Sequence, residues 1–393
     1  MEIVKEPKIN WLDKKWILLG LSLFLVVVSV ASINYQGGLD LGIDFTGGTL
    51  VHVKFRQEPR MDLIRRSLGE AGLRPEQVTR FDEPSKNQVQ IRMARIESEE
   101  TEDLSQESDR VVEALRRSFD KGDGAKAALD LNNVSRRVLA ARLQELDPQE
   151  LRASRSVTEF TLHYAEMAER LIDHRTEQGG IIQNFEALEG LNLPNPVTEA
   201  LQEHAVLGSF NLISVDSVGP KVGRELRKRA RDAVIFSLLG MLIYIAYRFK
   251  PIYGLAAIVA LFHDVFITVG AFSIANKELS LPVIAALLTL VGYSINDTIV
   301  VFDRVRENLR LMRHVDMKTI LNRSINQTLN RTIMTSGMTF LAVLSLLVLG
   351  GEALNAFSFA LVIGIIVGTY SSIAIASPIV LWWQDYSDRK KKA

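Results

Sequence analysis

The chain has 393 residues, of which 47% are hydrophobic and 23% are charged, and its formal net charge at pH 7 is zero. A mean hydropathy of +0.11 beside so many charges is typical of alternating apolar and polar blocks. Zero net charge provides no global basic field for binding nucleic acid. The absence of cysteine excludes disulfides and thiolate metal sites, and the six histidines lack ligand-like spacing, so we expect no metal site and no cofactor.

Six apolar stretches approach the roughly 20 residues that an α-helix needs to cross a bilayer. They are Trp16–Ile33, Ala233–Tyr247, Ile252–Ala275, Leu279–Phe302, Ile333–Leu349 and Ala356–Trp383. We therefore predict a membrane α-helical bundle of six transmembrane helices. The second stretch is short, so we expect its helix to begin outside the bilayer. The first stretch also has features of a cleaved signal peptide, but its length favours a retained anchor.

Lysine and arginine in short connections predict the orientation of the helices, because they favour the cytoplasmic side. They cluster before the first stretch, between the second and third, between the fourth and fifth, and after the sixth. All four groups fall on the cytoplasmic side in the following arrangement. Residues 1–34 form a cytoplasmic N-terminus and the first transmembrane helix, residues 233–383 form the other five helices, and residues 384–393 form a basic cytoplasmic tail. The basic group Arg224–Arg231 lies on the opposite side and conflicts with this rule, from which long translocated domains largely escape.

The polar block between the first two helices is expected to form an extracytoplasmic domain from residues 35–119 and 209–232. Apolar periodicity predicts its elements in the order strand, helix, strand, strand, helix, strand. These are a strand around Thr49–Phe55, a helix at Met61–Ala71, strands at Val78–Phe81 and Gln88–Met93, a helix at Asp109–Phe119 and a strand at Phe210–Val215. This is the order of an α+β ferredoxin-like domain.

Residues 120–208 are predicted to form a separate helical insertion. Its helices are expected at Leu131–Leu146, Val157–Arg175, Ile181–Leu188 and Pro196–His204, separated by glycine- and proline-containing turns. The pattern weakly resembles a helix-hairpin-helix module, which often holds DNA phosphates. Outside the cytoplasm we expect no nucleic acid, so a packing or partner-contact role is favoured.

Two regions carry distinctive motifs. The segment Asp44-Phe45-Thr46-Gly47-Gly48 opens the polar block, and paired glycines allow backbone conformations closed to other residues, although alone they usually mark only a turn. The fourth stretch contains Gly292–Asn308, which reads GYSINDTIVVFDRVREN, and Asn326–Thr332, which reads NQTLNRT, enters the fifth.

In this order, these motifs closely resemble the SecF branch of the SecD/SecF family of protein-export membrane proteins, over about residues 11–95 and 209–385. That family belongs to the resistance-nodulation-division (RND) superfamily of proton-coupled membrane machines. The resemblance implies six helices that form half of a twelve-helix assembly in the bacterial cytoplasmic (inner) membrane. It also implies SecD, the SecYEG channel, a translocating preprotein and the lipid bilayer as partners, with YajC and YidC as further candidates. The family lacks the central insertion, whose role is not carried over.

Asp297 is the best candidate for proton transfer, because a charge within a membrane helix is costly unless it is paired or hydrated. For such a carboxyl group, loss of water favours the neutral form and a nearby arginine favours the charged form. Arg331 at the start of the fifth stretch is the expected partner, and the resemblance implies that both belong to the proton path. The alternative is a permanent structural ion pair. Tyr293 lies one turn before Asp297 and is expected to orient it, and Asn296 completes the candidate relay.

Further polar residues are candidates for relay or coupling. His263 and Asp264 lie within the third stretch, where a relay role and a polar contact between helices are both open. A group of charged residues lies at the cytoplasmic boundary of the fourth stretch: Asp303, Arg304, Arg306 and Glu307. We favour the interpretation that they form a solvated helix end over a role in coupling. Gly364 and Gly368 have the spacing of close helix packing, either within the chain or against a partner half.

The sequence favours one function over two alternatives. The favoured function is a non-enzymatic subunit that uses the proton motive force with SecD to promote polypeptide translocation through SecYEG. A proton-coupled efflux component of the RND type is the first alternative, and a passive scaffold of the export complex is the second. The sequence contains neither a nucleophile–base set nor a phosphate-binding loop, which argues against covalent catalysis and ATP hydrolysis.

Overall fold

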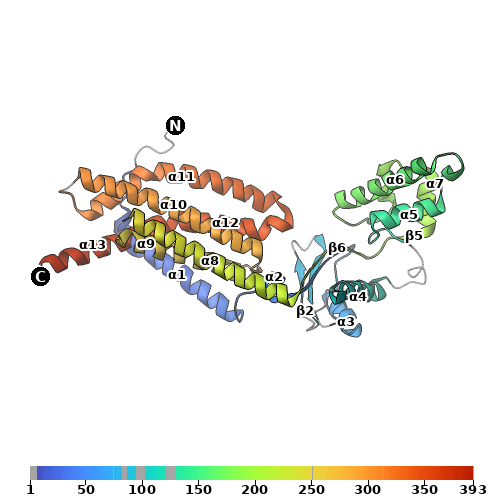
Figure 1. Ribbon diagram of the computed structural model, residues 1–393, viewed down its shortest axis with the longest axis horizontal. Helices are drawn as coiled ribbons and strands as arrows, with labels where there is room; N and C mark the ends of the chain where they lie inside the picture. The colour runs from blue at the N-terminus through green and yellow to red at the C-terminus, as the bar shows by residue number, and fades with distance from the viewer. Residues whose placement is uncertain are drawn as a thin grey trace. The chain divides into compact units, whose positions relative to one another are not determined.

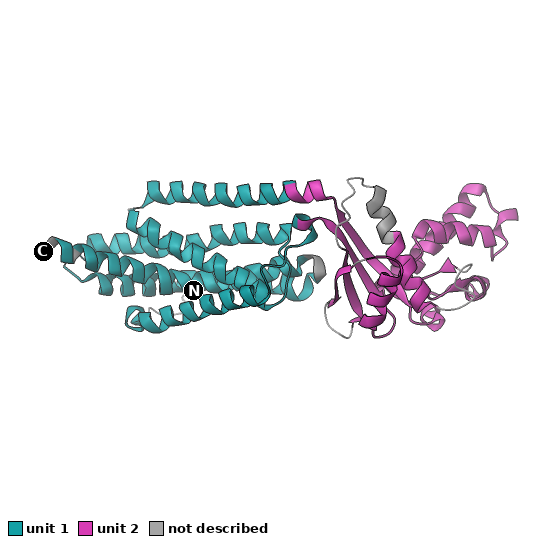
Figure 2. Cartoon of the chain, turned by 90° about the horizontal axis from the view of Figure 1, so that it is seen from below, with its two compact units in different colours: residues 1–45, 225–393 teal, residues 46–224 magenta. Residues whose placement is uncertain are grey.

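A computed structural model describes residues 7–73, 75–81, 86–93, 102–120, 129–249, 251–312 and 314–392. The chain divides into two compact units, coloured separately in Figure 2. We call residues 1–45 and 225–393 the membrane unit and residues 46–224 the polar unit. Each unit is described by itself.

Six helical spans in the described chain are long and apolar enough to cross a membrane, which confirms the predicted bundle. The 3₁₀ turn η1 (Trp11–Lys14) leads into α1 (Lys15–Tyr35), and the later helices are α8 (Pro220–Arg248), α9 (Pro251–Ile274), α10 (Leu281–Leu311), α11 (Met317–Leu349) and α12 (Gly351–Ser371). A π-helical turn, η5 (Ser372–Ala376), joins α12 to α13 (Ser377–Lys392), so the sixth span and the predicted tail form one helical run. Helix α8 begins earlier than its apolar stretch, since Pro220 suits the first helical position.

The spans differ in how much of each is buried inside the chain. Half of the residues in the apolar windows of α9 and α10, and 61% of those in the sixth span, are buried, against 6% for α8. Helices α9, α10 and α12 therefore form the centre of the membrane unit, and all three are labelled in Figure 1. Polar residues on these helices are the ones that the fold places away from lipid.

The polar unit contains a four-stranded antiparallel sheet and two helices. Its strands are β1 (Gly48–Phe55), β2 (Pro75–Phe81), β3 (Gln88–Met93) and β6 (Phe210–Val218), and its helices are α3 (Met61–Glu70) and α4 (Glu102–Phe119). The strands lie in the order β2-β3-β1-β6, which confirms the predicted ferredoxin-like arrangement. Alternate residues of β1 are buried against the helices, including Val51, Val53 and Phe55, and Ile64 of α3 and Leu115 of α4 complete this core.

The insertion forms a helical subdomain with its own apolar core. It contains β4 (Leu129–Asp130), α5 (Arg136–Leu146), η3 (Leu151–Ala153), α6 (Val157–Glu177), η4 (Phe185–Leu191), α7 (Asn195–His204) and β5 (Ala205–Val206). Helix α5 starts later than predicted because the Ser135 side chain accepts a hydrogen bond from Val138 N and caps the helix there. The predicted helix at Ile181–Leu188 is instead the 3₁₀ turn η4, whose cap is Asn184.

Asparagine side chains attach the insertion to the sheet. Asn133 Nδ2 donates to Phe210 O at 2.8 Å, and Leu212 N donates to Asn133 Oδ1 at 3.1 Å, so the amide pairs with β6 as a neighbouring strand would. On β1, Lys54 Nζ donates to Gly179 O at 2.6 Å. These bonds tie the insertion at Asn133 and Gly179 to the two adjacent strands β6 and β1.

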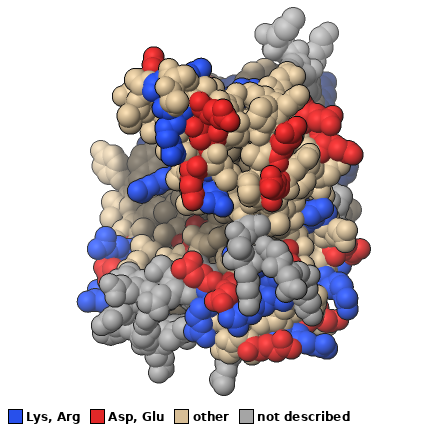
Figure 3. All heavy atoms as spheres, turned by 90° about the vertical axis from the view of Figure 1, so that its right-hand side faces the viewer, with Lys and Arg blue, Asp and Glu red and all other residues tan. Residues whose placement is uncertain are grey.

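Charges of both signs are interspersed over the face drawn in Figure 3, which includes the insertion. On α5 and α6, Arg136 pairs with Glu169 at 2.6 Å and with Asp173 at 3.2 Å. A phosphate-binding surface needs unpaired positive charge. The described helices of the insertion therefore give no support to phosphate binding at Arg136.

Candidate functional site

Asp297 lies on α10 in the centre of the membrane unit and is only 2% exposed. Its Oδ2 accepts a hydrogen bond from Ser336 Oγ of α11 at 2.9 Å. A carboxylate has about four acceptor positions, so this single described bond leaves most of its capacity unused. Asp297 is thus a buried acidic group that remains able to take a proton or another donor.

Arg331 lies on α11, five residues before Ser336, and its side chain is exposed. Its charge acts on Asp297, but the two described side chains do not form an ion pair within 4.0 Å. Thr369 of α12 is a further polar group close to Asp297. The arrangement places a cation near the carboxyl group without neutralising it by direct contact.

The other two residues of the candidate relay occupy different surroundings. Tyr293 packs against the apolar cluster between α10 and α12, and its buried Oη has no hydrogen-bond partner among the described residues. The hydroxyl that binds Asp297 therefore comes from Ser336 and not from Tyr293. Asn296 is exposed on the surface of α10.

His263 and Asp264 form a polar contact between three helices. Asp264 is fully buried, and its Oδ2 accepts from Ser294 Oγ of α10 at 2.5 Å and from Ser371 Oγ of α12 at 2.8 Å. Its Oδ1 lies 3.0 Å from His263 Nδ1. The side chain of Asp264 on α9 thus joins α10 and α12 at one point.

Glycines and the π-helical turn allow α12 to approach this point closely. A Cβ atom on Gly368 would lie 3.0 Å from Ser294 Cβ, and one on Gly364 would lie 2.5 Å from Leu290 Cδ1. Both glycines therefore serve packing within this chain, on α10. The π-helical turn begins at Ser372, directly after the serine that binds Asp264, and such turns often occur at functional sites.

The charged residues at the far end of α10 form one ion pair with α8 and one within α10. Asp303 accepts from Arg248 of α8 at 3.3 Å, and Arg304 pairs with Glu307 at 2.6 Å. Arg306 is exposed. This part of the group is a solvated helix end with one link to α8.

The motif NQTLNRT supplies contacts at the start of α11. Asn326 Oδ1 accepts from Trp11 Nε1 at 2.9 Å, and its Nδ2 donates to Ile9 O at 2.9 Å. Gln327 Oε1 accepts from the buried Asn308 of α10 at 2.9 Å. The motif therefore fixes α11 both to the segment before α1 and to the end of α10.

The first half of the Asp44–Gly48 segment binds helices of the membrane unit. Asp44 Oδ2 accepts from Leu281 N at 2.8 Å, which caps the N-terminus of α10, the helix that carries Asp297. The carbonyl oxygen of Phe45 accepts from Arg227 of α8 at 2.9 Å. Short helix α2 (Ile43–Thr46) holds both residues in place.

The second half of the segment starts the sheet of the polar unit. After Thr46, Gly47 and Gly48 have φ angles of +75° and +123°. A Cβ atom on Gly48 would lie 2.9 Å from the carbonyl oxygen of Met93 on β3. Glycine is required here both for the left-handed backbone and for the close approach of the two strands.

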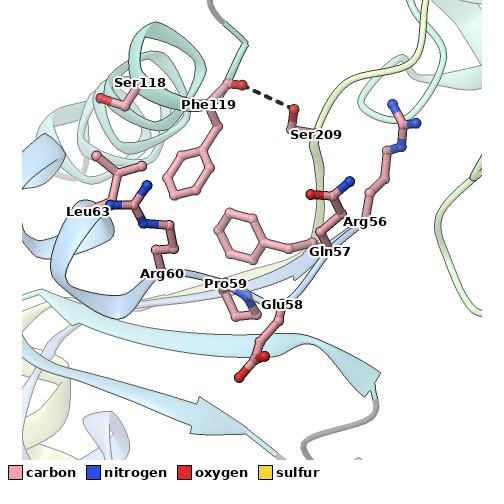
Figure 4. A pocket seen from close by; sticks show the side chains of 10 residues that line it. Arg56, Gln57, Glu58, Pro59, Arg60, Leu63, Ser118, Phe119 and Ser209 are labelled. Carbon is pink, nitrogen blue, oxygen red and sulfur yellow. Dashed lines mark hydrogen bonds between the residues drawn. The ribbon is translucent and has the colours of Figure 1, made fainter.

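The polar unit also has a cavity of about 320 Å³ beside β1, α3 and α4. Figure 4 shows Phe119 and Leu63 at its wall, whereas Arg56 and Glu58 point away from it. Arg56 is held by Leu207 O at 3.0 Å, and Glu58 pairs with Arg80 at 2.7 Å. The cavity contains none of the residues that the sequence motifs single out.

Two family models match the chain. The first, for the C-terminal part of the protein export membrane proteins SecD and SecF, covers residues 197–386, and the second, for the SecD/SecF GG motif, covers residues 36–59. A protein translocase subunit SecF from Koribacter versatilis is 42% identical over all of this chain and 96% of its own length. Another SecF, from Calditerrivibrio nitroreducens, is 35% identical over 97% of this chain and 96% of its own length. The chain belongs to the SecF family.

A solved structure agrees with this assignment. The crystal structure of SecDF from Thermus thermophilus, described as a translocon-associated membrane protein, superposes with a TM-score of 0.65 at 29% identity. The match covers 96% of this chain and 39% of that protein, so this SecF-family chain spans about two fifths of the SecDF polypeptide.

Sequence reasoning missed the hydroxyl groups that bind the two buried carboxylates in this SecF-family chain. Ser294 lies three residues before Asp297, and Ser336 lies five residues after Arg331. Serine is common in membrane helices, so the presence of a serine alone does not indicate that it binds a buried carboxylate. For Ser294, the available signal was its position on the same helical face as the buried acid Asp297. No group of three or more His, Asp or Glu residues in the described chain is placed to hold a metal ion.

Proposed function

We propose that this chain is a SecF-type subunit that uses proton movement through its membrane unit to promote polypeptide translocation, together with SecD and the SecYEG channel. The proposal is supported by membership of the SecF family and by the surroundings of Asp297. Proton-coupled efflux of small molecules is not favoured, because the relatives that match the whole chain are protein translocase subunits.

One observation carries the proton step: Asp297 is buried among neutral hydroxyl groups, bonded to that of Ser336, and lies near an arginine with which it does not pair. Burial disfavours its charge, whereas Arg331 favours it. A small movement of α11 against α10 would change the balance between the two influences. Asp297 would then take up a proton in one arrangement of the helices and release it in another.

The cap at Asp44 gives a route from this step to the polar unit. Helix α10 carries Asp297, and its first amide group, Leu281 N, is held by Asp44, four residues before β1 begins at Gly48. A shift of α10 along its axis would pull on Asp44 and thus on the start of the sheet. We propose that the polar unit lies outside the cytoplasm and moves in this way against the emerging polypeptide.

The proposed placement is the bacterial inner membrane with both chain termini in the cytoplasm. SecD would supply the other half of a twelve-helix assembly, and the preprotein would pass through SecYEG. YajC and YidC are proposed as additional neighbours. The passive-scaffold alternative shares this placement but assigns no proton transfer to Asp297.

The test is export of a secreted reporter in a strain that depends on this protein, with Asp297→Asn as the variant. Asp303→Asn is the matched control, since it makes the same chemical change at an exposed position of the same helix. We expect Asp297→Asn to assemble with SecD but to lose the part of export that responds to the proton gradient, while Asp303→Asn retains it. Unchanged export and gradient dependence in Asp297→Asn would favour the scaffold.

A further inference from the structure

The pair His263–Asp264 has an unused proton-accepting atom. His263 Nδ1 lies 3.0 Å from Asp264 Oδ1, and both side chains are at most 8% exposed. The other ring nitrogen, His263 Nε2, is buried and has no hydrogen-bond partner among the described residues. A buried polar atom without a partner is uncommon and calls for an explanation.

The hydrogen bonds around Asp264 suit a carboxylate that only accepts. Its Oδ2 accepts from the hydroxyl groups of Ser294 and Ser371, which leaves Oδ1 for His263. A charged carboxylate can only accept, so His263 Nδ1 must be the donor. Neutral His263 then carries its proton on Nδ1 and presents a free lone pair at Nε2.

Charge balance makes Nε2 a site for an incoming proton. With neutral His263, the group carries one negative charge, and an unpaired charge is costly inside a membrane protein. A proton on Nε2 converts the group into a neutral pair of imidazolium and carboxylate. The existing bonds of Asp264 to Ser294 and Ser371 remain intact in this step.

We propose that His263, oriented by Asp264, is a second proton-binding site of the membrane unit, with Nε2 as the atom that takes up the proton. This site is separate from Asp297 in chemistry, because it holds its proton on a nitrogen beside a fixed carboxylate. Asp264 acts as a positioning residue that selects the tautomer of His263.

Helices α10 and α12, which pack against α9, carry few ionisable residues near the pair in the described chain. Helix α10 carries Tyr293 and Asp297 on either side of Ser294, and α12 carries Tyr370, whose ring lies 6.5 Å from that of His263. Tyr370 donates its hydroxyl to Leu18 O of α1, and α1 has no ionisable side chain between Lys15 and Tyr35. No lysine or arginine lies on α9 between Pro251 and Ile274 to compensate Asp264.

The site has a direct link to Asp297. Ser294, which binds Asp264, lies three residues before Asp297 on the same face of α10. Charging His263 changes the field at this turn of α10. Coupling between the two sites rests on the proposed function, whereas proton binding at His263 does not.

The test is nitrogen NMR of the full chain in lipid nanodiscs with labelled histidine, recorded from about pH 8 to about pH 5, the range in which histidine usually titrates. The chain has six histidines, and loss of one signal in His263→Gln identifies the resonance. We expect neutral His263 with its proton on Nδ1 at high pH and a doubly protonated ring at low pH. In Asp264→Asn, we expect His263 to stay neutral over the same range.

His314, an exposed residue between α10 and α11, is the internal control, and its signals should be the same in both proteins at each pH. A neutral His263 with its proton on Nε2 would overturn the inference, and so would a titration that Asp264→Asn leaves unchanged. If Asp297→Asn does not affect export while His263 titrates as described, the proposed function fails and this site remains.

Discussion

Asp264 and Asp297 are both buried acids in the membrane unit, but their bonds give them different capacities to change. Asp264 is held by His263, Ser294 and Ser371, which come from three helices. Asp297 accepts a hydrogen bond from Ser336, and the hydroxyl group of Thr369 is also close to it. Breaking three bonds costs more than breaking fewer, since each contributes about 1 kcal/mol and more when one partner is charged. The proposed proton step therefore assigns the exchange of partners to Asp297 and not to Asp264.

Gly48 is predicted to be intolerant of a side chain. Gly48→Ala places a Cβ atom 2.9 Å from Met93 O at a φ of +123°, so we expect a loss of about 1–3 kcal/mol in the stability of the sheet. Gly69→Ala on α3 is the control, because its Cβ meets nothing within 4 Å and alanine favours a helix. Hydrogen exchange of the β1 and β3 amides in the full chain measures the stability of the sheet in both variants. Equal protection of these amides in Gly48→Ala and Gly69→Ala would contradict the prediction.

His52 on β1 is predicted to make the sheet less stable in mild acid. Burial lowers the pKa of His52 below its usual 6.5, although Asp216 opposes this shift. The unfolded chain then binds the proton more readily than the folded one, so stability is full above 6.5 and falls as pH decreases from 6.5 towards the lowered pKa.

Hydrogen exchange of β1 and β6 at about pH 7.5 and about pH 5.5 tests this, since the two values lie on either side of the usual histidine pKa. His52→Gln should remove this component of the pH dependence. The prediction is wrong if His52→Gln and the unchanged protein lose protection equally in acid.

At the residue scale, the sequence identifies the buried acids but not what binds them. Asp264 and Asp297 stand out because charges are rare in apolar stretches. Ser336 and Ser371 do not, because their importance depends on the rotation of α11 and α12, which a single sequence does not state. The pairing of Arg304 with Glu307 was missed for a similar reason, since i+3 and i+4 neighbours compete on a helix.

Among the elements, helices α1 and α9 pack closely where small residues of the two helices meet. A Cβ atom on Gly270 would lie 2.0 Å from Ser29 Oγ, and Ser32 Oγ lies 2.8 Å from Ser273 Oγ. Such close packing is a source of helix association in membranes. Helix α1 is therefore an integral part of the described bundle.

The chain lacks cysteine, so this contact can be measured with Ser32→Cys and Ser273→Cys together. We expect rapid disulfide formation in this background and strong slowing when Gly270→Leu is added, because the larger side chain separates the helices. Gly20→Leu on α1 is the control, since nothing lies within 4 Å of its Cβ position. Equal rates with Gly270→Leu and Gly20→Leu would contradict the packing described for Gly270.

Helix existence was predictable and helix ends were not. Hydropathy identified all six spans, because each contains a long apolar run. It could not show that α8 starts at Pro220 or that α10 continues to Leu311, since charged residues continue a helix as readily as apolar ones. The π-helical turn after Ser371 leaves no mark in hydropathy at all.

On the scale of the whole molecule, composition separated the membrane unit from the polar unit, and strand order within the polar unit was also predictable. Alternating apolar residues in β1 and helical spacing in α4 gave the ferredoxin-like order. The attachment of the insertion through Asn133 was not predictable, because its bonds to Phe210 and Leu212 join residues far apart in the sequence.

The proposed orientation makes a simple prediction for single-cysteine variants of this cysteine-free chain. Asn276→Cys lies between α9 and α10, His314→Cys lies between α10 and α11, and both positions are exposed. A membrane-impermeant thiol reagent added to intact spheroplasts should label Asn276→Cys and reach His314→Cys only after lysis. The reverse pattern would contradict the orientation.

The most direct test of the central claim is an infrared measurement of Asp297 in the complex with SecD. We predict a carboxylic-acid band that grows as pH falls through the physiological range and is absent in Asp297→Asn, while Asp303→Asn retains it. This result would show that Asp297 exchanges a proton under working conditions. A spectrum in which Asp297→Asn removes no pH-dependent band would contradict the relay and leave Asp297 as a structural residue.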